Sequence, residues 1–166
     1  MPLTSDELLA QLENLGISAK TASHPPLHTV EESKRLRGEL PGGHVKNLFL
    51  RDKRGRYWLL TTLEDTRVDL KEMARRLDAG KFSFADHEAL ARLLGIAPGA
   101  VSPLAAVNDS EGQVTVVLDE ALLAHDPLNV HPLRNDRTTA LSPADLLRFL
   151  SECGHTPTVT AFAAVP

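Results

Sequence analysis

The stretch that decides the fold is residues 45–63, with the sequence VKNLFLRDKRGRYWLLTTL. Two runs rich in leucine, aromatic and β-branched residues, 45–51 and 57–63, flank the polar segment 52–56, which contains Gly55. A loop of this length with a glycine is typical of a β-hairpin, because glycine readily adopts the left-handed turn conformation. The stretch therefore predicts two antiparallel strands and anchors the fold prediction to a β-sheet.

Helices and further strands are predicted on both sides of this hairpin. Helical spacing of apolar residues, capping residues and terminal glycines predict helices over 5–16, 29–38, 69–77, 86–95, 119–124 and 142–153. Short β-rich runs predict strands over 17–24, 82–84, 113–118, 128–133, 138–141 and 156–162. Segment 95–103 holds two Gly and two Pro, so we expect a shaped loop there. The order of these elements predicts an α/β (α+β mixed) fold, with a mixed sheet surrounded by helices in a single domain over residues 1–166.

Composition and charge narrow the class of protein. The chain has 166 residues, 42% of them hydrophobic, which suits one globular core. Its longest apolar runs fall far short of the roughly 20 residues that a bilayer requires, and its N-terminus does not resemble a secretory signal, so we expect a cytoplasmic protein without a membrane segment. The net charge of −4 argues against a protein that coats nucleic acid. Residues 1–83 nevertheless carry 14 basic and 12 acidic side chains, against 4 and 10 in residues 84–166, so the first half could offer a local basic surface.

Several chemistries find no support in the sequence. It contains no phosphate-binding glycine loop, no dinucleotide fingerprint, no His-Glu-x-x-His and no Gly-x-Ser-x-Gly. His24 and His28 are separated by two prolines and cannot share a helix face, so we predict no metal site. Cys153, the single cysteine, excludes an internal disulfide. It stands at a predicted helix C-terminus, where the negative end of the dipole raises a thiol pKa, so we interpret it as a small buried residue and not a nucleophile.

Three segments are candidates for binding or chemistry. Lys46 at the start of a buried strand either reaches solvent or faces a pocket as a cation, with Asn47 beside it supplying a donor and an acceptor. His131 precedes a proline in a short β-like segment and alone is as compatible with a packed histidine as with a catalytic one. The loop from Gly99 to Pro103 could bring backbone N–H groups close to a ligand.

Taken together and in this order, these pieces resemble the YbaK/prolyl-tRNA synthetase-associated editing domain family. The resemblance covers nearly the whole chain and is carried by the segments HPP (24–26), TVEES (29–33), GHVKNLFL (43–50), Gly99-x-x-x-Pro103 and NVHPL (129–133). Within the family, KNLFL followed by the Tyr-Trp-Leu strand is most similar to the ProXp-ala (PrdX-like) type, which deacylates alanyl-tRNA(Pro).

The resemblance implies a trans-editing hydrolase that cleaves the ester between a wrong amino acid and the terminal adenosine of tRNA(Pro), without metal or cofactor. Lys46 would hold the adenosine and the ester, and Asn47 would help to orient it. The loop from Gly99 through Ser102 to Pro103 would present backbone donors near the carbonyl and contact the substrate. His131 would position substrate or water, and the neighbouring ribose hydroxyl would help to direct the water.

The small free energy by which a binding pocket can distinguish alanine from proline explains why such an enzyme is needed. A pocket built for proline cannot exclude alanine by size, because each absent methylene is worth only about 1–3 kcal/mol. A second, smaller pocket can admit alanine and reject proline. From the motif positions we expect its walls among Val30, Leu36, Leu48 and Phe49.

A tRNA acceptor end as partner also accounts for the charge asymmetry. Basic residues on both sides of the motif could meet its phosphates or first base pair. They are Lys34, Arg35 and Arg37 before the predicted strand, and Arg75, Arg76 and Lys81 after it. Two alternatives stay open at this point: deacylation of another mischarged tRNA, such as the cysteinyl or seryl form, and a nucleic-acid-binding module without catalysis. Whether a prolyl-tRNA synthetase delivers the substrate is also open.

Overall fold

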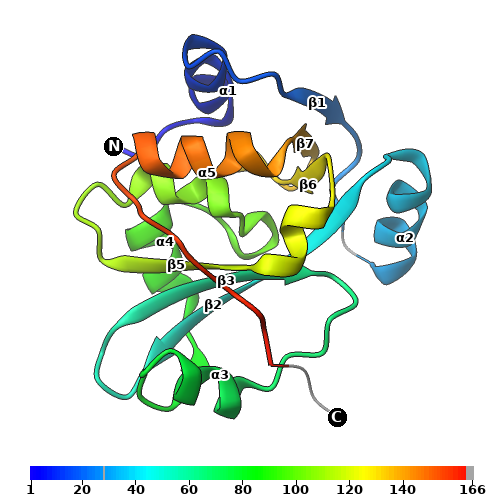
Figure 1. Cartoon of the computed structure of the whole chain (residues 1–166). Coiled ribbons are helices and arrows are strands. Elements are labelled where there is room, and N and C mark those ends of the chain that lie inside the picture. Colours follow the sequence, from blue (N-terminus) through cyan, green and yellow to red (C-terminus); the bar gives the residue numbers. More distant parts are fainter. Residues whose placement is uncertain (28, 164–166) are drawn as a thin grey trace.

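The computed structural model describes residues 1–27 and 29–163 (Figure 1). Within this part of the chain, strands form one mixed sheet in the order β1-β7-β6-β2-β3-β5-β8, and β4 pairs with β2. The strands are β1 (Lys20–Ser23), β2 (Gly43–Asp52), β3 (Tyr57–Leu63), β4 (Phe82–Phe84), β5 (Val114–Asp119), β6 (Leu128–Val130), β7 (Arg137–Leu141) and β8 (Thr158–Thr160). The predicted mixed α/β fold is confirmed.

The helices begin where the sequence supplies capping side chains. The α-helices are α1 (Ser5–Asn14), α2 (Val30–Glu39), α3 (Leu70–Arg76), α4 (His87–Leu94) and α5 (Pro143–Glu152). Each is preceded by a Thr, Asp or Ser whose side chain accepts a hydrogen bond from a backbone N–H in the first turn. Three 3₁₀ segments complete the set: η1 (Pro98–Ala100), η2 (Pro103–Asn108) and η3 (Glu120–Ala124).

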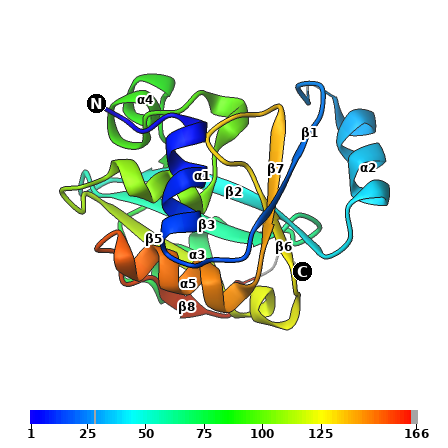
Figure 2. The same ribbon diagram turned by 90° about the horizontal axis from the view of Figure 1, so that it is seen from above.

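Helices cover both faces of the central strands. Figure 1 shows α1, α4 and α5 on one side of the sheet and α3 on the other. The side covered by α1, α4 and α5 holds two adjoining clusters of buried hydrophobic residues. One includes Phe149 and Val116, and the other includes Leu59 and Leu94. The side covered by α3 has a separate cluster of buried hydrophobic residues, which includes Leu50. Figure 2 shows that α2 lies beyond β1 and β7, apart from the other helices.

The predicted hairpin forms with continuous register. Its pairs run from Val45 opposite Leu63 to Arg51 opposite Tyr57. The buried carboxylate of Asp52 closes the turn, because it accepts hydrogen bonds from the backbone N–H groups of two turn residues and of Gly80, and from the Trp58 indole at 3.1 Å. Burial alone would raise the pKa of Asp52, but these hydrogen bonds outweigh it and lower the pKa to about 2.

The structure differs from the sequence predictions at three places. Residues 120–124 form a 3₁₀ segment and not an α-helix. The shaped loop predicted over residues 95–103 contains η1. It leads into the buried turn η2, and this turn was not predicted. Strand β6 ends at Val130, earlier than expected, ahead of Pro132. No helix among the described residues is long and apolar enough to span a membrane.

Candidate active site at the open edge of strand β2

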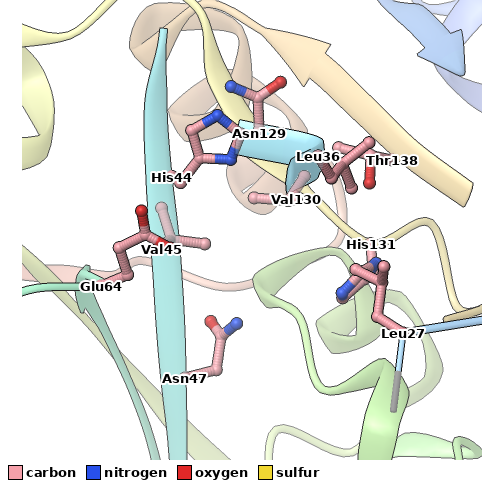
Figure 3. Close-up of a pocket in the computed structure, with 10 residues that line it drawn as sticks. All are labelled: Leu27, Leu36, His44, Val45, Asn47, Glu64, Asn129, Val130, His131 and Thr138. Atoms are coloured by element: carbon pink, nitrogen blue, oxygen red, sulfur yellow. The ribbon is translucent and has the colours of Figure 1, made fainter. Parts of the chain in front are cut away.

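A pocket of about 100 Å³ lies where β2 separates from β6. Figure 3 shows Val45 and Asn47 on the side of β2 that faces His131 and Leu27. The lining residues come from the segment before α2, from α2, β2, β6 and β7, and from the end of β3. They are Leu27, Leu36, His44, Val45, Asn47, Glu64, Asn129, Val130, His131 and Thr138.

Four of the ten residues that line this pocket are aliphatic, and the other six are polar: His44, Asn47, Glu64, Asn129, His131 and Thr138. Leu27 and Leu36 close it from the segment before α2 and from α2 itself, while Val45 and Val130 contribute from the diverging strands β2 and β6. The pocket is small, at about 100 Å³, and shares Leu27 and Leu36 with a neighbouring depression. Its size is compatible with a small side chain.

His131 presents a proton acceptor to the pocket. Its Nδ1 lies 2.9 Å from the backbone carbonyl oxygen of Arg137, which can only accept, so Nδ1 carries the proton. In the neutral ring Nε2 is therefore the unprotonated nitrogen. Burial lowers the pKa of His131, and the proximity of His24 adds to this, while the hydrogen bond to Arg137 opposes it. The ring is accordingly neutral at pH 7.

A second histidine supports this arrangement. His24 Nδ1 lies 2.8 Å from the carbonyl oxygen of Pro25, and its Nε2 lies 2.9 Å from the hydroxyl of Thr138 in the pocket wall. Since a carbonyl oxygen can only accept, Nδ1 carries a proton, and the contact between Nε2 and the Thr138 hydroxyl ties the ring to β7. The hydrogen bonds of His24 join the segment before α2 to β7 and fix one side of the pocket.

The Asn47 side chain makes two hydrogen bonds within the protein. Its amide donates to the carbonyl oxygen of Val101 at 3.0 Å, and its oxygen accepts from the Thr61 hydroxyl at 2.7 Å. Asn47 thus ties the middle of β2 to the loop that follows η1. The side chain positions two parts of the site against each other, and one amide N–H and one oxygen lone pair are not used by these bonds.

The predicted loop from Gly99 to Pro103 lies beside the pocket but does not line it. Gly99 is exposed and packs against Asn135, whose amide donates to the carbonyl of Leu27 at 2.8 Å; a Cβ at Gly99 would stand 3.1 Å from that amide nitrogen. Ser102 is fully buried, and its hydroxyl accepts from the backbone N–H of Leu104. Pro103 is buried in the first turn of η2. In this structure Ser102 and Pro103 therefore support the loop and do not contact the pocket.

A compact linker fixes α2 against β2. His44 Nε2 donates to the carbonyl oxygen of Leu40 at 2.9 Å, and the Asn129 amide donates to the carbonyls of Pro41 and Gly43. Gly42 has φ 105°, and a Cβ there would lie 2.2 Å from the Pro127 carbonyl oxygen, so only glycine fits. These contacts set the position of Leu36 above the pocket.

Lys46, Leu48 and Phe49 do not line the pocket. Side chains alternate along a strand, so Lys46 and Leu48 leave β2 on the face opposite Asn47. Leu48 packs against the α3 cluster, and Lys46 stands opposite the buried Thr62. Phe49 is on the same face as Asn47 but lies within the α4 cluster, stacked on Tyr57 at 5.7 Å. Of the four predicted walls, the structure places Leu36 at the pocket, and the side chain of Val30 falls outside the described residues.

The predicted phosphate-contacting cations are distributed over two regions. Arg35 lines a shallow depression that shares Leu27 and Leu36 with the pocket, and Lys34 is exposed nearby. Arg75 and Arg76 both pair with Glu72 on α3, and Lys81 lines a separate groove beside that helix. The side chain of Arg37 is not among those described. The cations of α2 are therefore closer to the pocket than those of α3.

Sequence reasoning missed several lining residues. Leu27 follows the quoted HPP segment, and Val45, Asn129 and Val130 lie within the quoted segments GHVKNLFL and NVHPL, but none of them was assigned a role in the site. No sequence signal indicated Thr138, because only the pairing of β7 with β6 brings this residue to the site.

The pocket contains no activated side-chain nucleophile. Cys153 ends α5, outside the pocket, and burial, with a contribution from Glu152, raises the pKa of its thiol to about 11. Among the described residues, no three His, Cys, Asp or Glu side chains gather as metal ligands would. The site instead offers a neutral imidazole, further polar side chains and main-chain groups around a small cavity whose wall is aliphatic in part.

Comparisons with known proteins agree with this picture. The model of the aminoacyl-tRNA editing domain family matches residues 24–149. The chain is 40% identical over 158 residues to prolyl-tRNA synthetase associated domain-containing protein 1 of Danio rerio, covering 94% of this chain and 86% of that protein. It is 36% identical over 150 residues to the prolyl-tRNA editing protein ProX of Acetoanaerobium sticklandii, covering 90% and 92%.

The fold is also found among solved structures. A crystal structure described as that of a candidate trans-editing enzyme for prolyl tRNA synthetase superposes with a TM-score of 0.73 at 22% identity, covering 99% of this chain and all of that one. The family model spans every segment that builds the pocket, from Leu27 to Thr138. This chain therefore belongs to the aminoacyl-tRNA editing domain family.

Proposed function

We propose that this protein is a trans-editing hydrolase that deacylates mischarged alanyl-tRNA(Pro). The observation that carries the proposal is the small pocket, walled in part by aliphatic side chains, that His131 lines with an unprotonated nitrogen. Membership of the editing domain family supplies the class of reaction, and the dimensions of the pocket favour alanine as the amino acid.

Pocket size supports discrimination by exclusion. Alanine would place one methyl group against Leu27, Leu36, Val45 and Val130, whereas the proline ring adds two methylene groups that these walls would have to accommodate. Each methylene is worth about 1–3 kcal/mol of discrimination, so two or more give a large preference for alanine. The pocket would thereby spare correctly charged prolyl-tRNA(Pro).

The reaction needs no side-chain nucleophile. A water oxygen adds to the ester carbonyl carbon, the bond from that carbon to the ribose oxygen breaks, and a proton from the water ends on the ribose oxygen. His131 Nε2 is placed to accept a hydrogen bond from this water or from the ribose hydroxyl beside the ester. The protein contributes mainly placement and electrostatic stabilisation.

Lys46 and Arg35 are assigned to the tRNA and not to the reacting carbonyl. Lys46 stands at the level of the pocket on the other face of β2, where a cation can meet the terminal nucleotide. Arg35 lies next to the pocket on α2, and can meet a phosphate of the same strand.

The proposal is tested by single-turnover deacylation of alanyl-tRNA(Pro). We expect His131→Ala to slow hydrolysis by about 100-fold or more, as for removal of a group that accepts a proton in the transition state. His87→Ala, which removes an exposed histidine on α4, is the matched control and should react like the unaltered protein. Full activity of the His131 variant would remove this residue from the mechanism, and no hydrolysis by the unaltered protein would refute the proposed function.

A further inference from the structure

The backbone groups of β2 alternate between its two edges. The carbonyl of His44 accepts from the N–H of Glu64, and the N–H of Asp52 donates to the carbonyl of Arg56, so even-numbered residues face β3. Odd-numbered residues face the opposite edge: the N–H of Gly43 bonds to Pro127, and the carbonyl of Phe49 accepts from Ala85.

That opposite edge is paired only at its two ends. Strand β6 pairs with β2 at Gly43 and His44, and β4 pairs with it from Leu50 to Asp52. Between them, four main-chain groups have no hydrogen-bond partner among the described residues. In order along the strand they are the carbonyl of Val45, the N–H and the carbonyl of Asn47, and the N–H of Phe49.

These groups face the pocket. Val45 and Asn47 line it, and both residues are only partly exposed. Main-chain polar groups in such a setting are nearly always paired, and an unpaired strand edge is a ready template for another extended chain. The gap therefore has the donor and acceptor pattern of a site for a short main-chain ligand.

An aminoacyl ester has the matching pattern. Its ammonium group is a donor and its carbonyl oxygen an acceptor, placed on either side of one α-carbon as in a strand residue. In an antiparallel hydrogen-bonded pair, two residues exchange both of their main-chain bonds. One aminoacyl group can therefore satisfy the N–H and the carbonyl of Asn47 together, with its side chain near the pocket walls.

We propose that Asn47 binds the aminoacyl group through its main chain: its carbonyl accepts from the α-ammonium, and its N–H donates to the ester carbonyl oxygen. The inference rests on the proposed function and extends it. The same N–H stabilises the negative charge that forms on the carbonyl oxygen when water adds to the carbon. The side chain, held by Val101 and Thr61, keeps this part of β2 rigid and its N–H aimed at the gap.

Amide hydrogen exchange of the full chain tests this directly. The probe is 3′-(L-alanylamino)-3′-deoxyadenosine, which keeps the ammonium and the carbonyl but replaces the labile ester with an amide. We expect saturating probe to slow exchange of the Asn47 N–H by at least 10-fold. The N–H groups of Lys46 and Leu48 face β3 and serve as internal controls, with little change. The lactyl analogue, in which a hydroxyl replaces the ammonium, should bind at least 10-fold more weakly.

Three results would overturn the proposal: unchanged exchange at Asn47 while the His131 resonances report bound probe, equal affinity for both analogues, or no binding of the alanyl probe at millimolar concentration. Alanyl-tRNA(Pro) hydrolysis is measured on the same preparation. Hydrolysis together with any of these results rejects the main-chain role of Asn47 alone, whereas absent hydrolysis rejects the proposed function.

Discussion

Shortening the Leu36 side chain should relax the size selectivity of the pocket. Leu36 projects from α2 and lines the pocket opposite β2. Leu36→Ala removes three carbon atoms from the wall, more than the one methylene by which a 2-aminobutyryl group exceeds an alanyl group. Because one methylene is worth about 1–3 kcal/mol, the unaltered protein should prefer the alanyl ester by about 10- to 200-fold. In the variant we expect this ratio to approach one.

The assay is single-turnover deacylation of alanyl- and 2-aminobutyryl-tRNA(Pro) with each protein. Leu36 is only partly buried, so the loss of stability should stay below the roughly 2 kcal/mol at which fully buried leucine truncations begin. Leu147→Ala removes a similarly half-buried leucine from α5 and should leave the selectivity unchanged. An unchanged ratio in a folded Leu36→Ala protein would refute the reasoning that this residue forms the wall.

Four further results are expected. Because the pKa of His131 is lowered and its neutral form is the acceptor, the deacylation rate should be constant near pH 7 and fall only below the ordinary histidine value of 6.5; a rate that already declines above pH 7 would contradict this. Asp52→Asn should lower the free energy of unfolding at pH 7 by about 2 kcal/mol or more, and urea titrations should show the difference vanishing as pH falls from about 4 to 2, since the lowered carboxyl pKa stabilises the fold only above that range. The Cys153 thiol, with a pKa of about 11, should be alkylated at pH 8 far more slowly in the native than in the denatured protein; equal rates would place it at the surface. Arg35→Ala should weaken tRNA(Pro) binding and reduce the salt dependence by about one released ion, whereas Arg148→Ala on α5 should bind like the unaltered protein.

The hairpin was predictable because its signal is local. Two runs rich in leucine, aromatic and β-branched residues, a short polar turn and Gly55 all lie within residues 45–63, and the structure pairs them from Val45 to Arg51. Capping residues and helical periodicity likewise marked all five α-helices. The 3₁₀ turn η2 was missed although Ser102 and Pro103 mark its start as Ser142 and Pro143 mark that of α5, because the glycines and prolines of residues 95–103 favoured an irregular loop.

The pocket was predictable only in part, because it is assembled from distant segments. Asn47 and His131 were recognised from their motifs, but Thr138 and Leu27 reach the site through strand pairing and loop contacts. Proximity in sequence also misled the choice of walls. Leu48 is next to Asn47, yet alternation along the strand sends it to the opposite face of the sheet.

Buried polar residues near a motif required the structure for their interpretation. Ser102 was expected in a loop that presents backbone donors, and the structure shows that its hydroxyl accepts from the N–H of Leu104 at the start of η2. Asn47 was expected to orient the substrate, and the structure shows that its side chain also binds Val101 and Thr61. These hydrogen bonds depend on distant segments or on the local turn, so the residue types alone did not indicate them.

The most direct test of the account is the rate of single-turnover deacylation for four esters on the same tRNA(Pro): alanyl, cysteinyl, seryl and prolyl. The account predicts that the alanyl ester is hydrolysed fastest and the prolyl ester at least 100-fold more slowly, because the two additional methylene groups of the proline ring would crowd the walls of the small pocket. Hydrolysis of the prolyl ester at the alanyl rate, or of none of the four, would contradict it.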